Sequence, residues 1–500
     1  MLLTCLMCFC GFILNEDDSH FFMSREPDQM TVEGLNAFVD QYAGTQVTHL
    51  FLCPNAMKAS YRSNVWDAIW DLTPTQVEPK DDPVATRWMS NAKLLHERGL
   101  DPYEIWIARC REKGIRPWLS MRMNDVHNAD NVASYIHSTF WIDHPEYWRV
   151  PGGGGWTDRA FDYAIPEVRE HHMKFIRELL ERYDPNGLEL DWMRFGYHFK
   201  PGHEAEGRPI LTRFMREVRA LTREWSSKRG HRIMLGARVP ATPKSAFGLG
   251  MDAVAWAREG LIDLVVPTPF WATADFDIPV EQWRKELAAT SVAIAPGAEI
   301  LLRAYPGAEA TTNDIMSIRG FAASCLDRGA DRIYTFNYMD PAPMTGGPEA
   351  YRALLEQGLS LVPVTTQPRR HPVTYRDTVA PGASNGAQLP AQTGSAQTMK
   401  SAEFKIHIGP APENGTVTFV AGLAQKDAVA GAEFEATING EACEPLPDLD
   451  NPSQFPGSAR AIEFKCPIKA IKDGYNIAEI KQVNSGADQQ IIWAELRITP

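Results

Sequence analysis

The sequence has no run of 18 consecutive apolar residues, about the shortest length that spans a membrane as a helix, so we expect no membrane span. The most apolar stretch, 1–14, lacks the basic start of a secretory signal peptide, and no A-x-A-like cleavage site follows it. It continues directly into the strand-like sequence GFILNEDD. We therefore interpret it as part of the first core strand and expect a soluble protein, in a compartment that the sequence leaves unassigned.

Basic residues are the minority among the charged ones. The 500 residues include 50 Lys and Arg against 63 Asp and Glu, a formal net charge of -13. A surface of this sign repels phosphate backbones, so we expect no nucleic-acid partner. Apolar residues make up 44% and charged residues 23%, which is ordinary globular composition, and a chain of this length buries a large core without metals or disulfides.

Metal-binding and disulfide patterns are scarce. The eight cysteines form no legible disulfide framework, and the C-x-x-C-x-C of Cys5, Cys8 and Cys10 has no partner Cys or His at ligand spacing close behind it. No H-x-H or H-E-x-x-H spacing occurs. We therefore expect neither a metal nor a cofactor.

Strand-like apolar bursts alternate with helical stretches over the first 360 residues. The bursts lie at 10–18, 47–55, 115–125, 187–195, 232–240, 261–271, 299–307 and 332–340. Each is almost continuously apolar, as parallel strands buried on both faces are. Helical segments such as 167–183, 212–228 and 314–329 lie between them. Eight βα units in this length predict an α/β fold, with a (β/α)8 TIM-like barrel over residues 1–362.

The composition changes after residue 362. Residues 363–401 are rich in Pro, Ser, Thr, Gln and Gly, which predicts a connector and irregular cover. From 402 to 500, six short stretches alternate apolar and polar residues, and Asn439-Gly440 is typical of a hairpin turn. These features predict a C-terminal antiparallel β-sandwich domain.

Every apolar burst ends in polar or charged residues. They are Asn15, Asp17, Asp18, Asn55, Arg122, Asn124, Asp125, Asp191, Arg194, Arg238, Thr268, Arg303, Asn337, Tyr338 and Asp340. Because the carboxyl ends of barrel strands build the active site of this fold, we expect these side chains around one pocket. The long aromatic segments 56–114 and 126–166 are expected to form its walls.

Arginines are the most informative of these strand-end residues. Four strands end in one, at Arg122, Arg194, Arg238 and Arg303. A neutral sugar needs no set of guanidinium groups, whereas a substrate carboxylate is bound by Arg in bidentate geometry. The alternative is that they form structural ion pairs with aspartates around the barrel rim.

Carboxylates and histidines supply candidates for proton transfer. Asp17 and Asp18 end the first strand, and Asp191 ends the fourth. Adjacent strand residues point to opposite faces, so only one of Asp17 and Asp18 should face the pocket centre. The histidines near the first and third strand ends are His20, His127, His137 and His144, and we expect at least one of them to have a functional role.

Four segments together resemble the inverting sialidases of glycoside hydrolase family 156. They are NEDDSHFF after the first strand, MRMNDVH after the third, the His-bearing loop SYIHSTFWIDHPEYW, and GLELDWMRF at the fourth. The resemblance implies a metal-free exo-sialidase with an Asp general base and a His general acid. The base falls on the Asp17-Asp18 pair, with Asp17 favoured, and the acid falls on His137, with His127 as the rival.

The resemblance also implies how a sialylated glycan is held. A sialoside carries a carboxylate on its anomeric carbon, which stabilises a neighbouring imidazolium and would repel an ionised carboxylic acid. The arginines would bind that carboxylate, Trp141 could cover the acyl or glycerol arm, and a homodimer is an expectation at the level of the family. The residues expected to contact substrate are Asn15, Asp18, Arg122, Asn124, His127, Asp191, Arg194, Arg238, Arg303 and Asn337.

Two other functions stay open. One is a barrel glycosidase on uronic-acid or neutral glycans that uses two carboxylates such as Asp17 and Asp191. The other is a non-catalytic carbohydrate-binding barrel, which the full set of polar strand ends disfavours.

Overall fold

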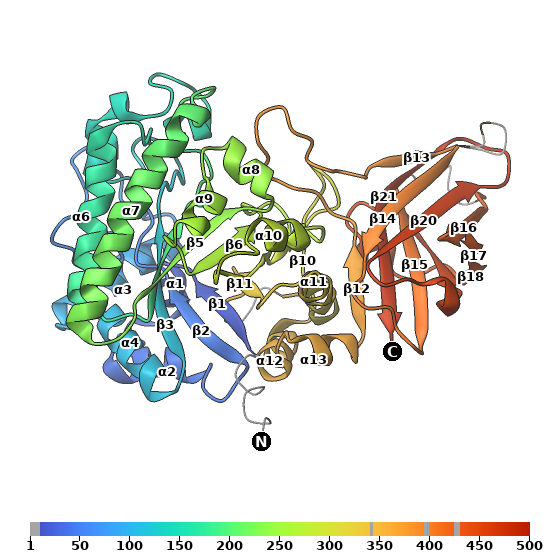
Figure 1. Cartoon of the computed structure of the whole chain (residues 1–500), viewed down its shortest axis with the longest axis horizontal. Coiled ribbons are helices and arrows are strands. Elements are labelled where there is room, and N and C mark those ends of the chain that lie inside the picture. The colour runs from blue at the N-terminus through green and yellow to red at the C-terminus, as the bar shows by residue number, and fades with distance from the viewer. Residues whose placement is uncertain (1–10, 341–343, 395–397, 399, 425–430) are drawn as a thin grey trace.

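The computed structural model describes residues 11–340, 344–394, 398, 400–424 and 431–500. An N-terminal α/β part and a C-terminal β part lie side by side (Figure 1). The apolar residues 1–10, with Cys5, Cys8 and Cys10, lie outside the described ranges. Within those ranges, no helix combines the length and the apolar character that crossing a membrane requires.

The N-terminal part is built on a curled parallel sheet. Its described strands follow the order β7-β6-β5-β4-β3-β2-β1-β11-β8. Their bounds are β1 Phe12–Glu16, β2 Val47–Leu52, β3 Arg116–Arg122, β4 Gly187–Asp191, β5 Met234–Pro240, β6 Leu264–Thr268, β7 Ala293–Ile294, β8 Gly297–Glu299 and β11 Tyr334–Phe336. Seven of the eight predicted ranges each contain a whole strand of this sheet, which confirms the α/β class and the barrel-like arrangement.

The seventh strand differs from the prediction. The sheet ends at β7 on one side and at β8 on the other, and only Ala295 and Pro296 separate these two short strands. Proline has no N–H to donate to a ladder, which accounts for the interruption. The hydrogen-bonded ladder therefore has two ends and is barrel-like rather than a closed (β/α)8 circle. The predicted strand 299–307 was wrong, because β9 (Leu301–Leu302) pairs antiparallel with β10 (Thr311–Thr312) instead.

Alternate residues of the strands fill the interior of the curled sheet. This interior cluster consists of Ile13, Phe51, Trp118, Leu264, Val266, Ala295, Tyr334 and Phe336. Trp118 stacks on Phe51 with ring centroids 4.7 Å apart. Gly187 pairs with Trp118 across β3 and β4, and a Cβ at Gly187 would lie 2.4 Å from the indole. The absence of a side chain at 187 thus makes room for the largest side chain of the interior.

Helices cover the outer face of the sheet (Figure 1). Their bounds are α1 His20–Ser24, α2 Val32–Asp40, α3 Pro83–Glu97, α4 Pro102–Glu112, α5 Thr139–Asp143, α6 Pro166–Arg182, α7 Glu204–Arg229, α8 Pro243–Gly248, α9 Ala253–Arg258, α10 Val280–Glu286, α11 Ile315–Asp327, α12 Gly347–Gln357 and α13 Leu361–Thr365. α3 and α4 begin at an Asp-Pro pair, where the carboxylates of Asp82 and Asp101 accept first-turn N–H groups. The three predicted helices are confirmed as α6, α7 and α11, and α7 begins eight residues before its prediction.

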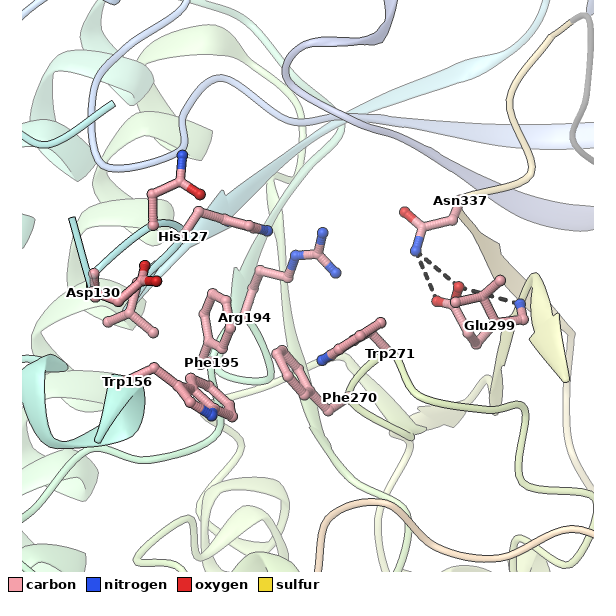
Figure 2. Close-up of a pocket in the computed structure, with 13 residues that line it drawn as sticks. His127, Asp130, Trp156, Arg194, Phe195, Phe270, Trp271, Glu299 and Asn337 are labelled. Atoms are coloured by element: carbon pink, nitrogen blue, oxygen red, sulfur yellow. Dashed lines mark hydrogen bonds between the residues drawn. The ribbon is translucent and has the colours of Figure 1, made fainter. Parts of the chain in front are cut away.

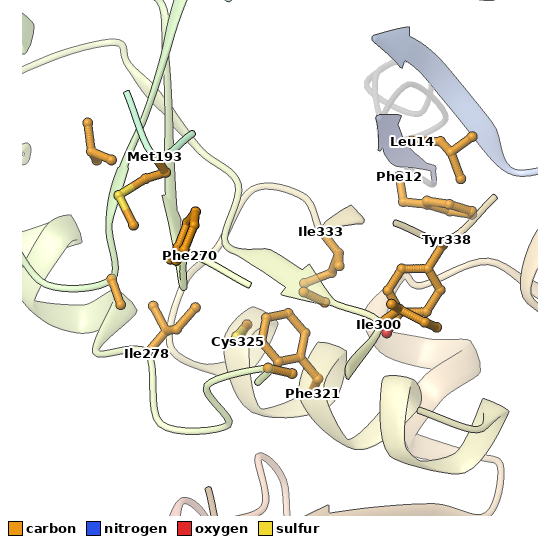
Figure 3. Packing of buried hydrophobic residues seen from close by; sticks show 14 of the residues in the cluster. Phe12, Leu14, Met193, Phe270, Ile278, Ile300, Phe321, Cys325, Ile333 and Tyr338 are labelled. Atoms are coloured by element: carbon orange, nitrogen blue, oxygen red, sulfur yellow. The ribbon is translucent and has the colours of Figure 1, made fainter. Parts of the chain in front are cut away.

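The core between sheet and helices is continuous. Phe321 and Cys325 on the buried face of α11 lie toward Ile278 and Ile333 (Figure 3). The same helix contacts β12 (Arg369–Pro372), at the start of the C-terminal β part. α11 therefore joins the two parts of the molecule.

The C-terminal part consists of two antiparallel sheets. One has the order β12-β21-β15-β19-β18, with β13 on β21, and the other has the order β14-β20-β16-β17. Their remaining bounds are β13 Ala391–Thr393, β14 Ser401–His407, β15 Thr416–Leu423, β16 Phe434–Ile438, β17 Glu441–Ala442, β18 Glu444–Pro445, β19 Arg460–Cys466, β20 Tyr475–Gln482 and β21 Gln489–Thr499. All six predicted stretches are strands, and positive φ angles at Asn439 and Gly440 confirm the predicted hairpin turn.

The predicted connector contributes to both parts. β12 and β13 lie inside 363–401 and pair with β21 of the C-terminal sheet. Arg370 of β12 donates to Asp314 at the start of α11 at 2.6 Å and to Glu495 of β21 at 2.8 Å. These buried ion pairs hold the start of α11 and strand β21 in a fixed position on either side of β12.

Candidate active site

Two cavities meet at the carboxyl ends of the sheet strands. The first, here called the aromatic half, has a volume of about 470 Å³. Its walls are Val126, His127, Asn128, Ala129, Asp130, Trp156, Arg194, Phe195, Phe270, Trp271, Glu299, Leu301 and Asn337. The second, the acidic half, has a volume of about 380 Å³ and is lined by Asp17, Asp18, Ser19, Met23, Trp88, Arg122, His127, Asn128, Tyr135, Ile136, Arg194, Asn337 and Met339.

Four residues belong to both halves: His127, Asn128, Arg194 and Asn337. They form the boundary across which a ligand would extend. Figure 2 shows the guanidinium of Arg194 pointing into the space between His127 and Asn337, with the aromatic side chains on one side of it. The position agrees with the rule that parallel-strand folds bind ligands at the carboxyl ends of their strands.

The imidazole of His127 lies within ion-pair distance of the carboxylate of Asp125. Nδ1 of His127 lies 2.7 Å from Oδ1 of Asp125, and the backbone N–H of His127 donates to the same oxygen at 2.9 Å. Asp125 is buried, yet His127 and Arg122 hold the pKa of its carboxyl below the usual range. The carboxylate fixes the ring so that Nε2 is the nitrogen left for the cavity. About 38% of the His127 side chain is exposed, so a ligand can reach it.

Asp17 and Asp18 share one arginine but differ in environment. Arg122 contacts both carboxylates, and Ser19 donates to Asp17 through its hydroxyl at 2.7 Å and its N–H at 3.1 Å. Burial would raise the pKa of Asp17, but Arg122, Asp18, Arg194 and Ser19 together lower it well below the usual range. Burial and the negative charge of Asp17 raise the pKa of Asp18. The two environments therefore shift the carboxyls in opposite directions, toward the ionised form for Asp17 and toward the protonated form for Asp18.

Arg194 differs from the other three predicted arginines. Its side chain has no hydrogen-bond or ion-pair partner among the described residues, its Nε is buried without one, and it lines both halves of the site. It follows β4, and the Arg194-Phe195 peptide bond is cis. Burial, together with the positive charge of Arg122, lowers its pKa. A half-buried guanidinium without a side-chain partner, on the wall of both halves, favours a site that receives an anion.

The other three arginines are held by the protein itself. Arg122 is bound to aspartates, and Arg238 donates to Asp191 at 2.9 Å and lies over the ring of Phe336. Arg303 donates to the backbone oxygen of Ala272 and lies outside the parallel sheet, because the seventh strand ends before it. The prediction that all four face substrate is thus corrected to Arg194, with Arg122 at the wall of the acidic half.

His137, the favoured acid in the sequence interpretation, is fully buried. Its Nε2 bonds the backbone oxygen of His127 at 3.0 Å, its ring packs on Trp141 at 4.2 Å, and it lines neither half. Burial lowers its pKa, so the ring is held neutral. Trp141 is equally buried, which places it away from a substrate arm. His127 therefore replaces His137 as the histidine within reach of a ligand.

Two further predicted residues have structural partners. The amide of Asn124 donates to the backbone oxygens of Phe161 and Tyr197, and the carboxylate of Asp191 is held by Arg238. Asn15 is half-buried and lines neither half. Asn337 does line both halves, as predicted, with a positive φ of 64°. Of the remaining histidines, His20 bonds Glu16 and Asp340, and His144 bonds Glu146 at the surface.

Glu299 is a site residue that the sequence interpretation missed. It ends β8 and lines the aromatic half, and both of its carboxylate oxygens accept from Nδ2 of Asn337, at 3.0 and 2.8 Å (Figure 2). Burial raises its pKa to about 7, against the lowering effects of Asn337, Arg194 and Arg238. The predicted strand 299–307 begins at Glu299, whereas the observed strand β8 ends there. The Pro-Gly at 296–297 was the signal for an earlier strand that ends at Glu299.

Four aromatic side chains form one wall of the aromatic half: Trp156, Phe195, Phe270 and Trp271. Trp156 stacks on Phe270 with centroids 5.9 Å apart and an interplanar angle of 16°. Trp156 and Trp271 remain 45% and 43% exposed, whereas Phe195 and Phe270 are buried behind them. Sequence analysis assigned Trp156 to a pocket loop but did not single out the other three.

Among the described residues, no three His, Cys, Asp or Glu side chains come together as a metal-ligand set. The polar groups around the two halves are the His127–Asp125 pair, the carboxylate of Asp17, the guanidinium of Arg194, which has no side-chain partner, and the carboxyl group of Glu299, whose pKa is raised. This set can protonate, deprotonate and bind an anion.

Comparison with known proteins finds weak likenesses to proteins named as glycosyl hydrolases and glycosidases. No protein-family model matches the chain. It is 20% identical over 262 residues to "Glycosyl hydrolase DigH" of Escherichia coli K12, across 43% of this chain and 55% of that one. The same figures hold for the Shigella flexneri protein of that name. The chain thus spans about half the length of the curated relatives that it matches.

The likenesses to solved structures are also weak. An alpha-L-fucosidase from Paenibacillus thiaminolyticus is 12% identical, with 95% of this chain and 96% of that one covered and a TM-score of 0.33. A β-L-arabinopyranosidase from Geobacillus stearothermophilus is 10% identical, with 95% and 97% covered and a TM-score of 0.37. Likenesses at this level do not select a substrate, so the chemistry rests on the residues described above.

Proposed function

We propose that this protein is an exo-acting glycosidase for sugars that carry a carboxylate, with terminal sialic acid as substrate and inversion at the anomeric carbon. The unpaired guanidinium of Arg194, on the boundary between the acidic and the aromatic half, carries the proposal. A sialoside carboxylate would supply the anion that this guanidinium lacks. Around it lie a histidine that can donate a proton and a carboxylate that can accept one.

His127 is the general acid of the proposed reaction. Its Nε2 donates a proton to the glycosidic oxygen as the bond to the anomeric carbon breaks, so that the leaving group departs as an alcohol. Asp125 stabilises the imidazolium before the transfer through the 2.7 Å contact to Nδ1. The substrate carboxylate would add a second negative charge next to the ring.

Asp17 is the general base. It takes a proton from a water molecule whose oxygen forms the new bond to the anomeric carbon, on the face opposite to the leaving group. The low pKa of Asp17 keeps it ionised, and 14% of its side chain is exposed to the acidic half. Asp18 is almost fully buried and has a raised pKa, so it fits the role less well.

A second candidate function is favoured by Glu299. A carboxyl group with a pKa of about 7 on a cavity wall is suited to act as a general acid at neutral pH. With Asp17 as its partner, it would give a two-carboxylate glycosidase on neutral or uronic-acid glycans. Asp191 no longer fits as the second carboxylate, because Arg238 occupies it.

A substrate panel separates the two functions. The protein is incubated with an alpha-sialoside, a beta-glucuronide and neutral glycosides, and product release is followed by NMR. We expect cleavage of the sialoside, with the inverted anomer seen before mutarotation. Cleavage of the other glycosides alone supports the two-carboxylate enzyme, and a retained anomer contradicts single displacement.

A further inference from the structure

The two halves of the site are chemically unlike. Asp17 and Asp18 line only the acidic half, whereas Trp156, Phe270 and Trp271 line only the aromatic half. His127 and Arg194 belong to both. A ligand bound at the boundary therefore meets carboxylates on one side and a broad aromatic surface on the other.

In a single displacement, water attacks the anomeric carbon on the face opposite to the leaving group. Because the base Asp17 lies in the acidic half, the leaving group lies toward the other side of the boundary, in the aromatic half. This step rests on the proposed function, since it takes Asp17 as the base and His127 as the acid. The position of His127 on the boundary agrees with it, because the acid must reach the oxygen that joins the two parts of the substrate.

The aromatic half has the surface of a platform for a sugar ring. Trp156 and Trp271 present exposed indoles, and the buried rings of Phe195 and Phe270 support them at centroid distances of 5.2 Å for Trp156–Phe195 and 6.1 Å for Phe270–Trp271. Large apolar rings that stay exposed on a cavity wall mark a binding surface. The C–H faces of a sugar pack on such rings, while its hydroxyls reach polar groups such as Glu299 and Asn337.

The loop that carries Trp271 is held by a carboxylate from the connector. Oδ1 of Asp377 accepts the N–H of Phe270, and Oδ2 accepts the N–H groups of Trp271 and Ala272, all at 2.8 Å. Arg303 donates to the oxygen of Ala272 and lies 5.4 Å from the ring of Trp271. Three successive backbone donors on one carboxylate fix the loop after β6, so the exposed indole has a defined position.

We propose that the aromatic half is a subsite for the leaving-group sugar, with Trp156 and Trp271 as its stacking platform and Asp377 as the residue that positions Trp271. The substrate class is then a glycan in which the acidic sugar is joined to a second sugar. A small alkyl aglycone would leave this subsite empty.

The test compares two substrates with leaving groups of the same chemistry: sialyl-lactose and methyl alpha-sialoside. Both lose an alcohol, so only the size of the aglycone differs. In the wild type we expect a higher kcat/KM for sialyl-lactose than for methyl alpha-sialoside. W271A and W156A should lower the ratio of kcat/KM for sialyl-lactose to kcat/KM for methyl alpha-sialoside roughly tenfold, the effect of about 1.4 kcal/mol of lost stacking. D377N replaces one of the two acceptor oxygens by an amide nitrogen, so at least one of the three N–H contacts is lost without touching substrate, and it should lower the same ratio.

Phe247 provides the control. It lies on α8, away from both halves, and is 47% exposed, like Trp271. F247A should leave both kcat/KM values unchanged, and thermal unfolding checks that every variant is folded. If wild type cleaves both substrates and the three variants keep the wild-type ratio, the subsite is refuted while the proposed function stands.

Failure of the proposed function gives a different result. Wild type would then cleave neither sialoside, and the platform is tested by the quenching of tryptophan fluorescence on addition of lactose. Quenching that W271A and D377N abolish supports the platform. Absence of lactose binding to wild type overturns it.

Discussion

Nδ1 of His127 lies 2.7 Å from Oδ1 of the buried Asp125, which makes His127 the exposed end of a histidine–carboxylate pair. Such pairs set both the orientation and the basicity of the ring. The two residues are separated by one position in the sequence, and the backbone N–H of His127 reinforces the geometry by donating to the same oxygen.

The first prediction concerns this pair. H127A should abolish cleavage of a natural sialoside but retain measurable turnover of an activated aryl sialoside, because an acidic phenol leaves without protonation. D125N should show the same pattern more weakly. His144 is the matched control, because 37% of its side chain is exposed and it bonds only Glu146. Equal loss of both substrates in H127A would contradict a role as acid.

The second prediction separates the two N-terminal aspartates. D17N should lower turnover by a factor of about 10²–10⁴, the usual cost of losing a general base, while the fold persists. D18N should have a smaller effect, because the raised pKa of Asp18 favours the neutral carboxyl and Asn preserves its shape. Steady-state kinetics and circular dichroism provide the measurements. A dead D18N beside an active D17N would reverse the assignment.

The third prediction contrasts the half-buried Arg194 with the buried Arg238. R194A should raise KM for the sialoside strongly and leave thermal stability unchanged or higher, because no described partner loses its charge. R238A should instead destabilise the fold by about 3–5 kcal/mol, because it leaves the buried Asp191 unpaired. Kinetics and denaturant unfolding of both variants test this contrast. It would be wrong if R238A were stable or R194A unfolded.

The fourth prediction is a pH dependence from Glu299. Its pKa is about 7 in the folded protein against an ordinary value of 4.5, so between these values unfolding releases a proton. The contribution of Glu299 to stability is present below about pH 4.5 and is lost as the pH rises through 7. E299Q should flatten this part of the stability–pH curve in urea unfolding. An unchanged slope would show that Glu299 is already ionised in the native state.

The fifth prediction tests the sheet interior. G187A places a methyl group 2.4 Å from the ring of Trp118 and should destabilise the protein by about 1–3 kcal/mol. G154A is the matched substitution, because no atom lies within 4 Å of its Cβ and its φ is not positive. Thermal unfolding should distinguish the two variants, and equal Tm values would refute the packing argument.

The fold was largely predictable because its signals are local. Buried parallel strands read as apolar bursts, and the C-terminal strands alternate and turn at Asn439-Gly440. The seventh strand failed because the sheet pairing is interrupted at Pro296 and β8 ends at Glu299, whereas the apolar residues 300–302 continue beyond that end. Apolar content alone does not show where pairing stops.

The site was predictable as a set of strand ends but not in its roles. The sequence placed arginines at the rim but could not show that Asp191 neutralises Arg238 whereas Arg194 lacks a described partner. It offered His137 and His127 as rivals, and burial distinguishes them. Glu299 and Asp377 were missed because their importance comes from contacts with Asn337 and with the loop after β6, which are distant in sequence.

The contact between Asp377 and residues 270–272 links the pocket to a segment that follows the barrel-like part in the chain. The unit that shapes the cavity is therefore larger than the unit that forms the parallel sheet. A chimera that exchanges everything after residue 362 would remove the carboxylate that fixes Trp271, even with every sheet strand retained. A recombinant protein keeps this wall of the pocket only if its native sequence extends at least to Asp377. The connector therefore has to be retained together with the barrel-like part.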